Sequence, residues 1–398
     1  MRTKSFILFL VCVVVTTVFL IGFGNQRPSI ETIVTETHKQ LNNLKTFKED
    51  LYNAQEKRLV ADSKYLKRLG FTQHPRLYPH SVWKNTTLPV VITYIFVKVS
   101  TKCSQCAMSA GMGWNRPVRL SFILGFDTTK VTEVLDGQEQ QAVGFAHNIA
   151  HYLPNHTALI YNLGLEHYAY QMLLGHCNSS RCTVVNYDLS VFPSHVEEER
   201  LHAFRPLIIQ DALWKAGAVL FLECDYRLVT GHIEPLVQAA LVTGGGGVTS
   251  WPTKFATTSL THPKMFDYFC TSPDSFLFLP MVESSRILIY NNFGIHRELM
   301  LPWVKCALTR DCVYPIGAQS AGCRFNKKPQ YRYSGCHRFD GSALNIALGL
   351  HFGFDETRYI YQGQETFFRR IGPELAAEEL SGLDWNSTDS TITNKDGT

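Results

Sequence analysis

The sequence contains little charge. Of its 398 residues only 18% are Asp, Glu, Lys or Arg, and the formal net charge is +4. Because nucleic-acid-binding domains carry a concentrated basic surface, this weak and dispersed charge argues against a nucleic-acid partner. Apolar residues make up 45% of the chain, so it can bury one large domain of about 250 to 300 residues, plus appendages.

Two common ligand-binding signatures are also missing. The four glycines at 244–247 are not followed by Lys and Ser or Thr, and they do not join a strand to a helix, which excludes a phosphate-binding loop of the nucleotide-hydrolase type. Cys103 and Cys106 have the spacing of a zinc half-site, but no second pair of Cys or His follows at a zinc spacing. We therefore favour a disulfide or free thiols over zinc for these two cysteines.

One long apolar run stands near the start of the chain. Phe6–Phe23 contains no charged residue and has about the length needed to span a bilayer. It lacks the short apolar region and small-residue cleavage site of a secretory signal peptide. Arg2 and Lys4 precede it and acidic residues follow, so we predict a cytoplasmic tail at 1–4, a transmembrane signal anchor at 5–23 and a lumenal remainder.

Sequons and cysteines agree with a lumenal remainder. Of eleven cysteines, ten follow the apolar run, which is typical of proteins in oxidising compartments. Cys177 and Cys182 bracket a short segment and could close a small loop, whereas the connectivity of four later cysteines stays open: Cys306, Cys312, Cys323 and Cys336. Sequons for N-glycosylation occur at Asn85, Asn155, Asn178 and Asn386.

Composition divides the chain after the anchor into three parts. Residues 24–87 are rich in charged and polar side chains with a thin apolar stripe, which predicts a helical stem ending in a proline-containing loop. Residues 88–375 are predicted to form the lumenal domain. From residue 376 the sequence is acidic and rich in Ser and Thr, so residues 376–398 are predicted to be a disordered tail.

Strand-like and helix-like patterns alternate in the predicted domain. Apolar and β-branched runs predict strands at 88–99, 118–125, 157–162, 182–187 and 218–222. Helical patterns lie between them at 131–152, 164–174 and 205–217, and a further helix is predicted at 234–242. This order indicates an α/β fold with a mostly parallel twisted sheet flanked by helices. Later in the chain, residues 276–282 and 286–293 are predicted to be paired strands.

The stretch Arg205–Leu228 carries the strongest functional signal. Its helix ends at Gly217, and Ala218–Leu222 is an unbroken apolar run, as expected for a parallel strand buried on both faces. Glu223 and Asp225 follow at the carboxyl end of this strand, where ligands bind in open α/β sheets. Carboxylate oxygens suit Mg²⁺ or Mn²⁺, which commonly bridge one or two acids to substrate phosphates.

This stretch resembles the Asp-x-Asp segment of fold-A (GT-A) glycosyltransferases, which hold a nucleotide sugar through a divalent metal. Here the motif reads Glu-Cys-Asp, and Gly341 stands where retaining enzymes of the Asp-Gln-x type carry Gln. The chain is more closely similar to an uncharacterised animal family of type II membrane proteins distantly related to those enzymes. That resemblance covers roughly Leu120–Phe354 and is carried by Ile160–Leu165, Arg205–Leu213 and Cys336–Asn345.

The resemblance implies a GT-A-like fold and a set of donor-side residues. Asp225 would bind Mn²⁺ or Mg²⁺ directly, Glu223 would contact the metal, a metal-bound water or the ribose, and His337 is a candidate third metal ligand. Arg205 would steady the phosphates; pairing with Glu197 or Glu198 at the helix start is its alternative. Asp127 and Thr128, at a strand's carboxyl end, are candidates for contact with the base or ribose, although a helix cap is an equal alternative.

On the acceptor side, the resemblance points to Asp340. A carboxylate there could act as general base in an inverting transfer, while capping of the helix that it opens is the alternative. We therefore predict a Golgi or endoplasmic-reticulum glycosyltransferase that moves a sugar from a nucleotide-sugar donor to a glycan or protein acceptor. The alternative is a non-catalytic lumenal or cell-surface binding protein that kept the fold and lost the metal, which Glu223 and Cys224 favour.

Overall fold

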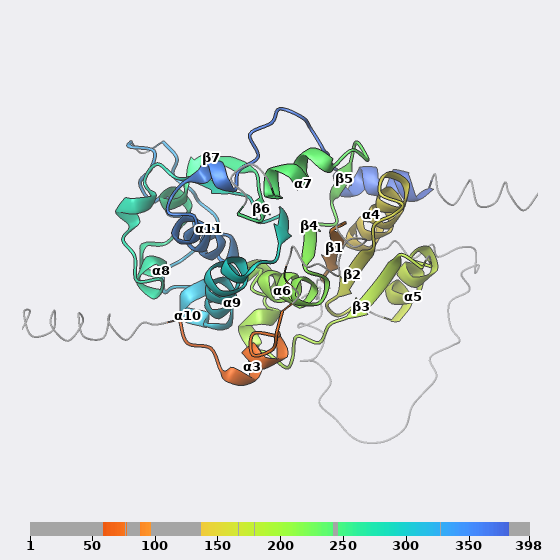
Figure 1. Ribbon diagram of the computed structural model, residues 1–398, viewed down its shortest axis with the longest axis horizontal. Helices are drawn as coiled ribbons and strands as arrows, with labels where there is room; N and C mark the ends of the chain where they lie inside the picture. Colours follow the sequence, from red (N-terminus) through yellow and green to blue (C-terminus); the bar gives the residue numbers. More distant parts are fainter. Residues whose placement is uncertain are drawn as a thin grey trace, which may run out of the picture. The chain divides into compact units, whose positions relative to one another are not determined.

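The computed structural model describes residues 59–75, 77, 88–96, 137–165, 167–178, 180–241, 246–326 and 328–381 (Figure 1). All of these belong to one unit of the chain, Leu59–Thr398. The predicted signal anchor, the strand at 118–125 and the candidates Asp127 and Thr128 lie outside the described residues. No helix within the described ranges has the length and apolar content to cross a membrane.

A central sheet organises the described part of the chain. Its strands follow the order β3 (Cys182–Asn186), β2 (Ala158–Asn162), β1 (Val90–Ile95), β4 (Ala218–Leu222), β9 (Arg286–Tyr290) and β6 (Val248–Thr249) (Figure 1). Strands β1 to β4 pair in parallel, and β9 is antiparallel to both β4 and β6. The prediction of an α/β fold with a mostly parallel sheet flanked by helices is confirmed.

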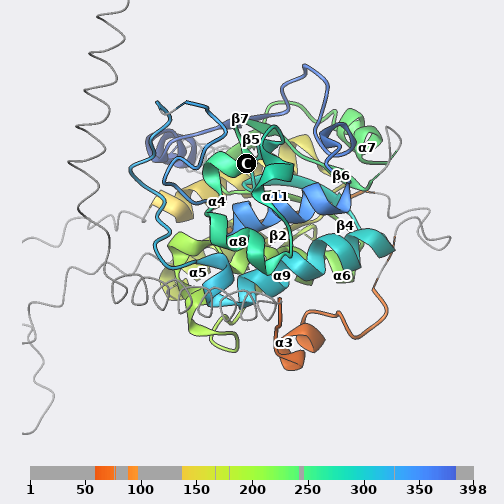
Figure 2. The ribbon, with the colours of Figure 1, turned by 90° about the vertical axis from the view of Figure 1, so that its left-hand side faces the viewer.

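Strand β4 lies in the middle of this sheet, with all five residues buried. Val219 and Phe221 pack on the face covered by α6 (Phe204–Ala216), α9 (Leu301–Leu308) and α11 (Asp340–His351). Leu220 and Leu222 pack on the opposite face with α4 (Gly137–Tyr152) and α7 (Glu234–Leu241). Figure 2 shows α9 and α11 side by side. Because alternate residues of a strand point to opposite faces, an unbroken apolar run requires these two layers of helices.

The turn from α6 into β4 depends on a glycine. Gly217 ends α6 with φ +84°, and its N–H donates to the Leu213 carbonyl at 2.7 Å. A residue without Cβ adopts this left-handed conformation at little cost, so the chain can leave the helix and enter the strand at the next residue. The helix end and the strand predicted for this stretch are confirmed, and the turn fixes where β4 begins.

The predicted pairing of 276–282 with 286–293 is wrong. β8 (Pro280–Val282) pairs with β7 (Pro252–Ala256), whereas β9 enters the central sheet beside β4. The four residues from Ile287 to Tyr290 are all buried, so β9 needs cover on both faces, which a two-stranded hairpin does not give. Further α-helices among the described residues include α3 (Ser63–Arg68), α5 (His167–His176), α8 (Pro263–Tyr268) and α10 (Arg310–Val313), and a π-helix at Ile295–Met300 leads into α9.

A small second sheet reaches the end of β4 from far along the chain. β5 (Tyr226–Leu228) pairs antiparallel with β10 (Phe368–Arg370), which places Arg370 opposite Tyr226. The N–H of Ile371 also donates to the Asp225 carbonyl at 2.9 Å. The register therefore brings the side chain of Arg370 to the acidic residues that follow β4.

Packed residues lie beyond both predicted boundaries of the domain. Leu69, in the predicted stem, is fully buried in the main core, and its carbonyl accepts a hydrogen bond from Gln210 Nε2 at 3.0 Å. Residues from Leu59 onward therefore belong to the same compact unit as the predicted domain. Residues 373–381 are helical and Leu380 is buried, so the domain also continues past residue 375 into the predicted tail. Leu69 and Leu380 lie in segments with few apolar residues, but both are buried because they pack against the rest of the domain.

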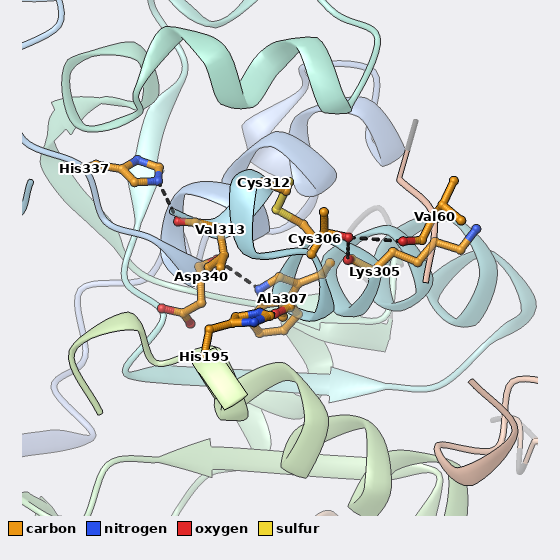
Figure 3. The surroundings of a disulfide bond; sticks show 11 residues. Val60, His195, Lys305, Cys306, Ala307, Cys312, Val313, His337 and Asp340 are labelled. Atoms are coloured by element: carbon orange, nitrogen blue, oxygen red, sulfur yellow. Dashed lines mark hydrogen bonds between the residues drawn. A yellow bond between two sulfur atoms is a disulfide. The ribbon is translucent and has the colours of Figure 1, made fainter. Parts of the chain in front are cut away.

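Within the described part of the chain, three disulfides link cysteines that lie close in sequence. Cys177 pairs with Cys182, as predicted, and the later cluster pairs consecutively as Cys306–Cys312 and Cys323–Cys336. Within the described residues Cys224 and Cys270 are free thiols. The second disulfide joins α9 to α10, next to the start of α11 (Figure 3).

Candidate functional site

A cavity of about 620 Å³ lies at the carboxyl end of β4. The chain runs from β1 through β2 to β3 on one side and then places β4 on the other side of β1, so the strand order reverses beside this end. Ligands of open α/β sheets bind at such a reversal. The charged residues among the described ones that line the cavity are Arg200, Arg205, Arg338 and Arg370, with Glu223, Glu283 and Asp340.

Arg205 joins the two predicted halves of the site. It is the second residue of α6, and only 3% of its side chain is exposed. Its Nη1 donates to Asp340 Oδ2 at 2.6 Å and to Ser284 Oγ at 2.9 Å, and its Nη2 donates to Glu223 Oε1 at 2.5 Å. The expected alternative pairing with Glu197 or Glu198 is not formed. Because its guanidinium is buried between two acids, Arg205 can present little of its charge to a ligand.

Glu223 and Asp225 share a second arginine. Arg370 donates from Nη2 to Glu223 Oε2 and from Nε to Asp225 Oδ2, both at 2.8 Å. Its guanidinium also lies 5.0 Å from the centre of the Tyr226 ring. A planar guanidinium suits this geometry because its donors are fixed in a fork. Arg370 is 55% exposed, so part of the group faces solvent at the cavity.

The residues present do not fit the predicted three-ligand metal centre. Three of the four carboxylate oxygens of Glu223 and Asp225 accept hydrogen bonds from arginine, and only Asp225 Oδ1 is buried without a partner. Burial raises the pKa of Asp225, and Arg370 opposes that rise. Across the described ranges, no group of three His, Cys, Asp or Glu side chains could hold a metal ion. Mn²⁺ or Mg²⁺ therefore stays a prediction, without the ligand set expected for it.

His337 is not available as the third ligand. It is fully buried, and its Nε2 is bonded to the Val313 carbonyl at 3.1 Å (Figure 3). Its Nδ1 accepts from the backbone N–H of His262 at 3.1 Å. Burial lowers the pKa of His337 to about 3, so the ring is neutral. Both ring nitrogens are thus used in holding the segment before α11. In this structure His337 therefore has a structural role.

Asp340 is the first residue of α11, as predicted, but it is not the cap. Phe339 occupies the cap position, with φ +46°, and no side chain caps the helix there. The Asp340 carboxylate instead bonds to Arg205, and its backbone carbonyl accepts from Trp303 Nε1 at 3.0 Å. Burial raises the pKa of Asp340 to about 6, while Arg205 acts in the opposite direction. At neutral pH this carboxyl is mainly ionised, as a general base must be.

Comparisons with known proteins give a limited result. No family model matches the sequence, and no curated protein matches it. Among solved structures, mouse xyloside xylosyltransferase 1 in its apo form is similar with a TM-score of 0.33 and 10% sequence identity. The match covers 56% of this chain and 79% of that chain. A likeness of this degree indicates neither a substrate nor an activity for this chain.

Several predicted sites lie apart from the cavity. Asn155 and Asn178 are exposed, as glycosylation acceptors must be, and their modification stays a prediction. Asn85 and Asn386 fall outside the described residues, like Asp127 and Thr128.

Sequence reasoning missed two arginines of the cavity. Arg370 lies 145 residues after Asp225, and only the pairing of β10 with β5 brings them together. No motif in the sequence signals that contact. Arg338, in contrast, lies inside the run Cys336–Asn345 on which the family resemblance rests, so a signal for it was present. Its guanidinium has no hydrogen bond or ion pair to the described residues.

Proposed function

We propose that this cavity binds a nucleotide sugar and transfers its sugar to a glycan or glycoprotein acceptor. One observation carries the proposal. The buried guanidinium of Arg205 ties Glu223, at the end of β4, to Asp340, at the start of α11. This fixes two carboxylates on one wall of a cavity at the carboxyl edge of a parallel sheet, where nucleotide ligands bind in α/β folds.

The chemistry of the lining suits such a substrate. A volume of about 620 Å³ falls within the range of small-molecule sites, which is roughly 300 to 1,000 Å³. Arg338 and Arg370 offer guanidinium groups to phosphate oxygens. An ionised Asp340 would accept the proton of an acceptor hydroxyl as that oxygen attacks the sugar. Arg205 would act through Asp340 and Glu223, by holding both in place.

A secretory-pathway location is part of the proposal. We place the chain in the Golgi or endoplasmic reticulum as a type II membrane protein with a lumenal domain. The apolar run Phe6–Phe23, the exposed sequons at Asn155 and Asn178, and the three disulfides support this location. Glycan and glycoprotein acceptors are abundant in that compartment.

The alternative is a non-catalytic binding protein with the same fold. The observation in its favour is that Glu223, Asp225 and Asp340 all pair with arginines of the chain itself. Carboxylates that are already compensated can be a structural network rather than a catalytic one. Both proposed functions use the same ligand cavity, but only the transferase would turn over its substrate.

The test uses the full chain purified in detergent. Thermal unfolding is measured with uridine, guanosine, cytidine and adenosine diphosphates, each with EDTA and with Mn²⁺. Binding at a concentration 100 times the dissociation constant stabilises by about 2.7 kcal/mol, which raises Tm by a few degrees. The matching nucleotide sugars are then tested for transfer to a glycan acceptor mixture. Binding with transfer supports the enzyme, binding without transfer supports the alternative, and no binding in either buffer contradicts both.

A further inference from the structure

We propose that Arg370 takes the place of a divalent cation in this cavity, so that the diphosphate of a nucleotide sugar binds without metal. The inference rests on the proposed function and specifies how its donor is held. It assigns to Arg370 a role that the sequence analysis gave to Mn²⁺ or Mg²⁺, and it assigns to Glu223 and Asp225 the task of holding Arg370.

The first argument is the contact itself. Arg370 bonds to one oxygen of each carboxylate at 2.8 Å, so it bridges Glu223 and Asp225 as a metal ion would. The other oxygen of Glu223 bonds to Arg205. A metal ion would have to displace the two charge-assisted hydrogen bonds of Arg370. It would also have to share a small volume with a permanent positive charge.

The second argument is how firmly the backbone places this arginine. Arg370 is the last residue of β10, whose ladder with β5 continues in the hydrogen bond from the Ile371 N–H to the Asp225 carbonyl. Its guanidinium is also over the Tyr226 ring, at 5.0 Å from the centroid. Two acids, one ring and the backbone thus hold the group at the end of β4.

The third argument is the unused hydrogen-bonding capacity. Arg370 donates to the acids from Nε and Nη2, while Nη1 has no hydrogen bond to any described residue. The guanidinium of Arg338, which lines the same cavity, is also without a partner among the described residues. These groups can bond to the oxygens of a diphosphate. Arg370 and Arg338 are therefore two arginines of the cavity whose guanidinium groups have donors left for phosphate oxygens.

One experiment tests the metal directly and needs no nucleotide. Binding of Mn²⁺ to the full chain is measured by calorimetry and by electron paramagnetic resonance. We expect no saturable Mn²⁺ binding to the wild type. Arg370→Ala frees one oxygen of Glu223 and one of Asp225 and should create a Mn²⁺ site, whereas Arg369→Ala, the exposed neighbour on the same strand, should not. One Mn²⁺ bound by the wild type and lost in Asp225→Asn overturns the proposal.

The second experiment measures pyrophosphate and uridine diphosphate binding in EDTA. We expect binding to the wild type, a loss of affinity of about tenfold or more in Arg370→Gln, and a change below about twofold in Arg369→Gln. Arg370→Lys should bind with intermediate affinity, since it keeps the charge without the fork, and thermal unfolding checks that each variant is folded. Binding that requires Mn²⁺ overturns this inference and leaves the proposed function standing. If neither pyrophosphate nor any of the nucleotides binds, with or without Mn²⁺, both this inference and the proposed function are wrong.

Discussion

Arg205 donates a hydrogen bond of 2.6 Å to Asp340, although 135 residues separate them in the chain. The contact joins the first turn of α6 to the first turn of α11. A negatively charged side chain is favourable at the amino terminus of a helix and a positively charged one is not, because the backbone N–H groups there are partly positive. Asp340 therefore gains from its helix, whereas Arg205 depends on Asp340 and Glu223 for compensation.

The first prediction concerns that dependence. Arg205→Met should lower the free energy of unfolding by about 3 to 5 kcal/mol, since it leaves Asp340 buried without its partner and removes one partner of Glu223. Urea unfolding of the full chain measures the change. Arg200→Met is the matched control, because Arg200 is exposed and its ion pair is with Glu198 at the surface. Its effect should stay below about 1 kcal/mol, and equal effects of the two substitutions would contradict the assignment.

The second prediction is a pH dependence of stability from Asp340. Burial raises the pKa of this carboxyl from 3.8 to about 6, so the folded state holds the proton more tightly than the unfolded state. Its contribution favours folding below the unfolded pKa and is lost as pH rises through about 6.

Asn does not titrate, so Asp340→Asn supplies the reference. The unfolding free energy of the wild type minus that of Asp340→Asn should fall by about 2 kcal/mol between about pH 4 and pH 7. Urea unfolding at several pH values measures this difference. A difference that grows with pH would show that the Arg205 pair outweighs burial.

The third prediction concerns the disulfide Cys323–Cys336. It closes a segment with a sequence separation of 13 and ends one residue before His337, in the wall of the cavity. Replacing both cysteines with Ser should lower stability by about 2 to 4 kcal/mol and weaken nucleotide binding. The pair Cys177–Cys182 spans a separation of 5 beside β3, so its removal should cost less and leave nucleotide binding unchanged. Denaturation and ligand titration of the two double variants distinguish these outcomes.

The fourth prediction tests the compartment. When the full chain is expressed in animal cells, Thr157→Ala should remove one glycan because it destroys the sequon of Asn155. Thr157→Ser keeps the sequon and should keep the glycan. Gel mobility before and after glycosidase digestion gives the result. An unmodified wild-type protein would count against a lumenal location.

Local patterns in the sequence determined the fold class and much of the secondary structure. The glycine stop of α6 and the apolar run of β4 were predictable because both depend on neighbouring residues. The acidic pair at 223 and 225 was recognisable for the same reason. The pairing of β9 could not be predicted in this way. Its sequence is compatible with a hairpin or with the central sheet, and only the packing on both of its faces decides between them.

The tertiary structure alone decided what the acids contact. The sequence pattern predicted that Arg205, Glu223, Asp225 and Asp340 lie near a ligand site. It did not predict that Arg205 and Arg370 form ion pairs with the three acids. The partner Arg370 arrives through a strand pairing across 145 residues, and His337 turns its nitrogens toward backbone groups. Side-chain type sets which ions a residue can bind, but competition among charges brought together by the fold determines which one it does bind.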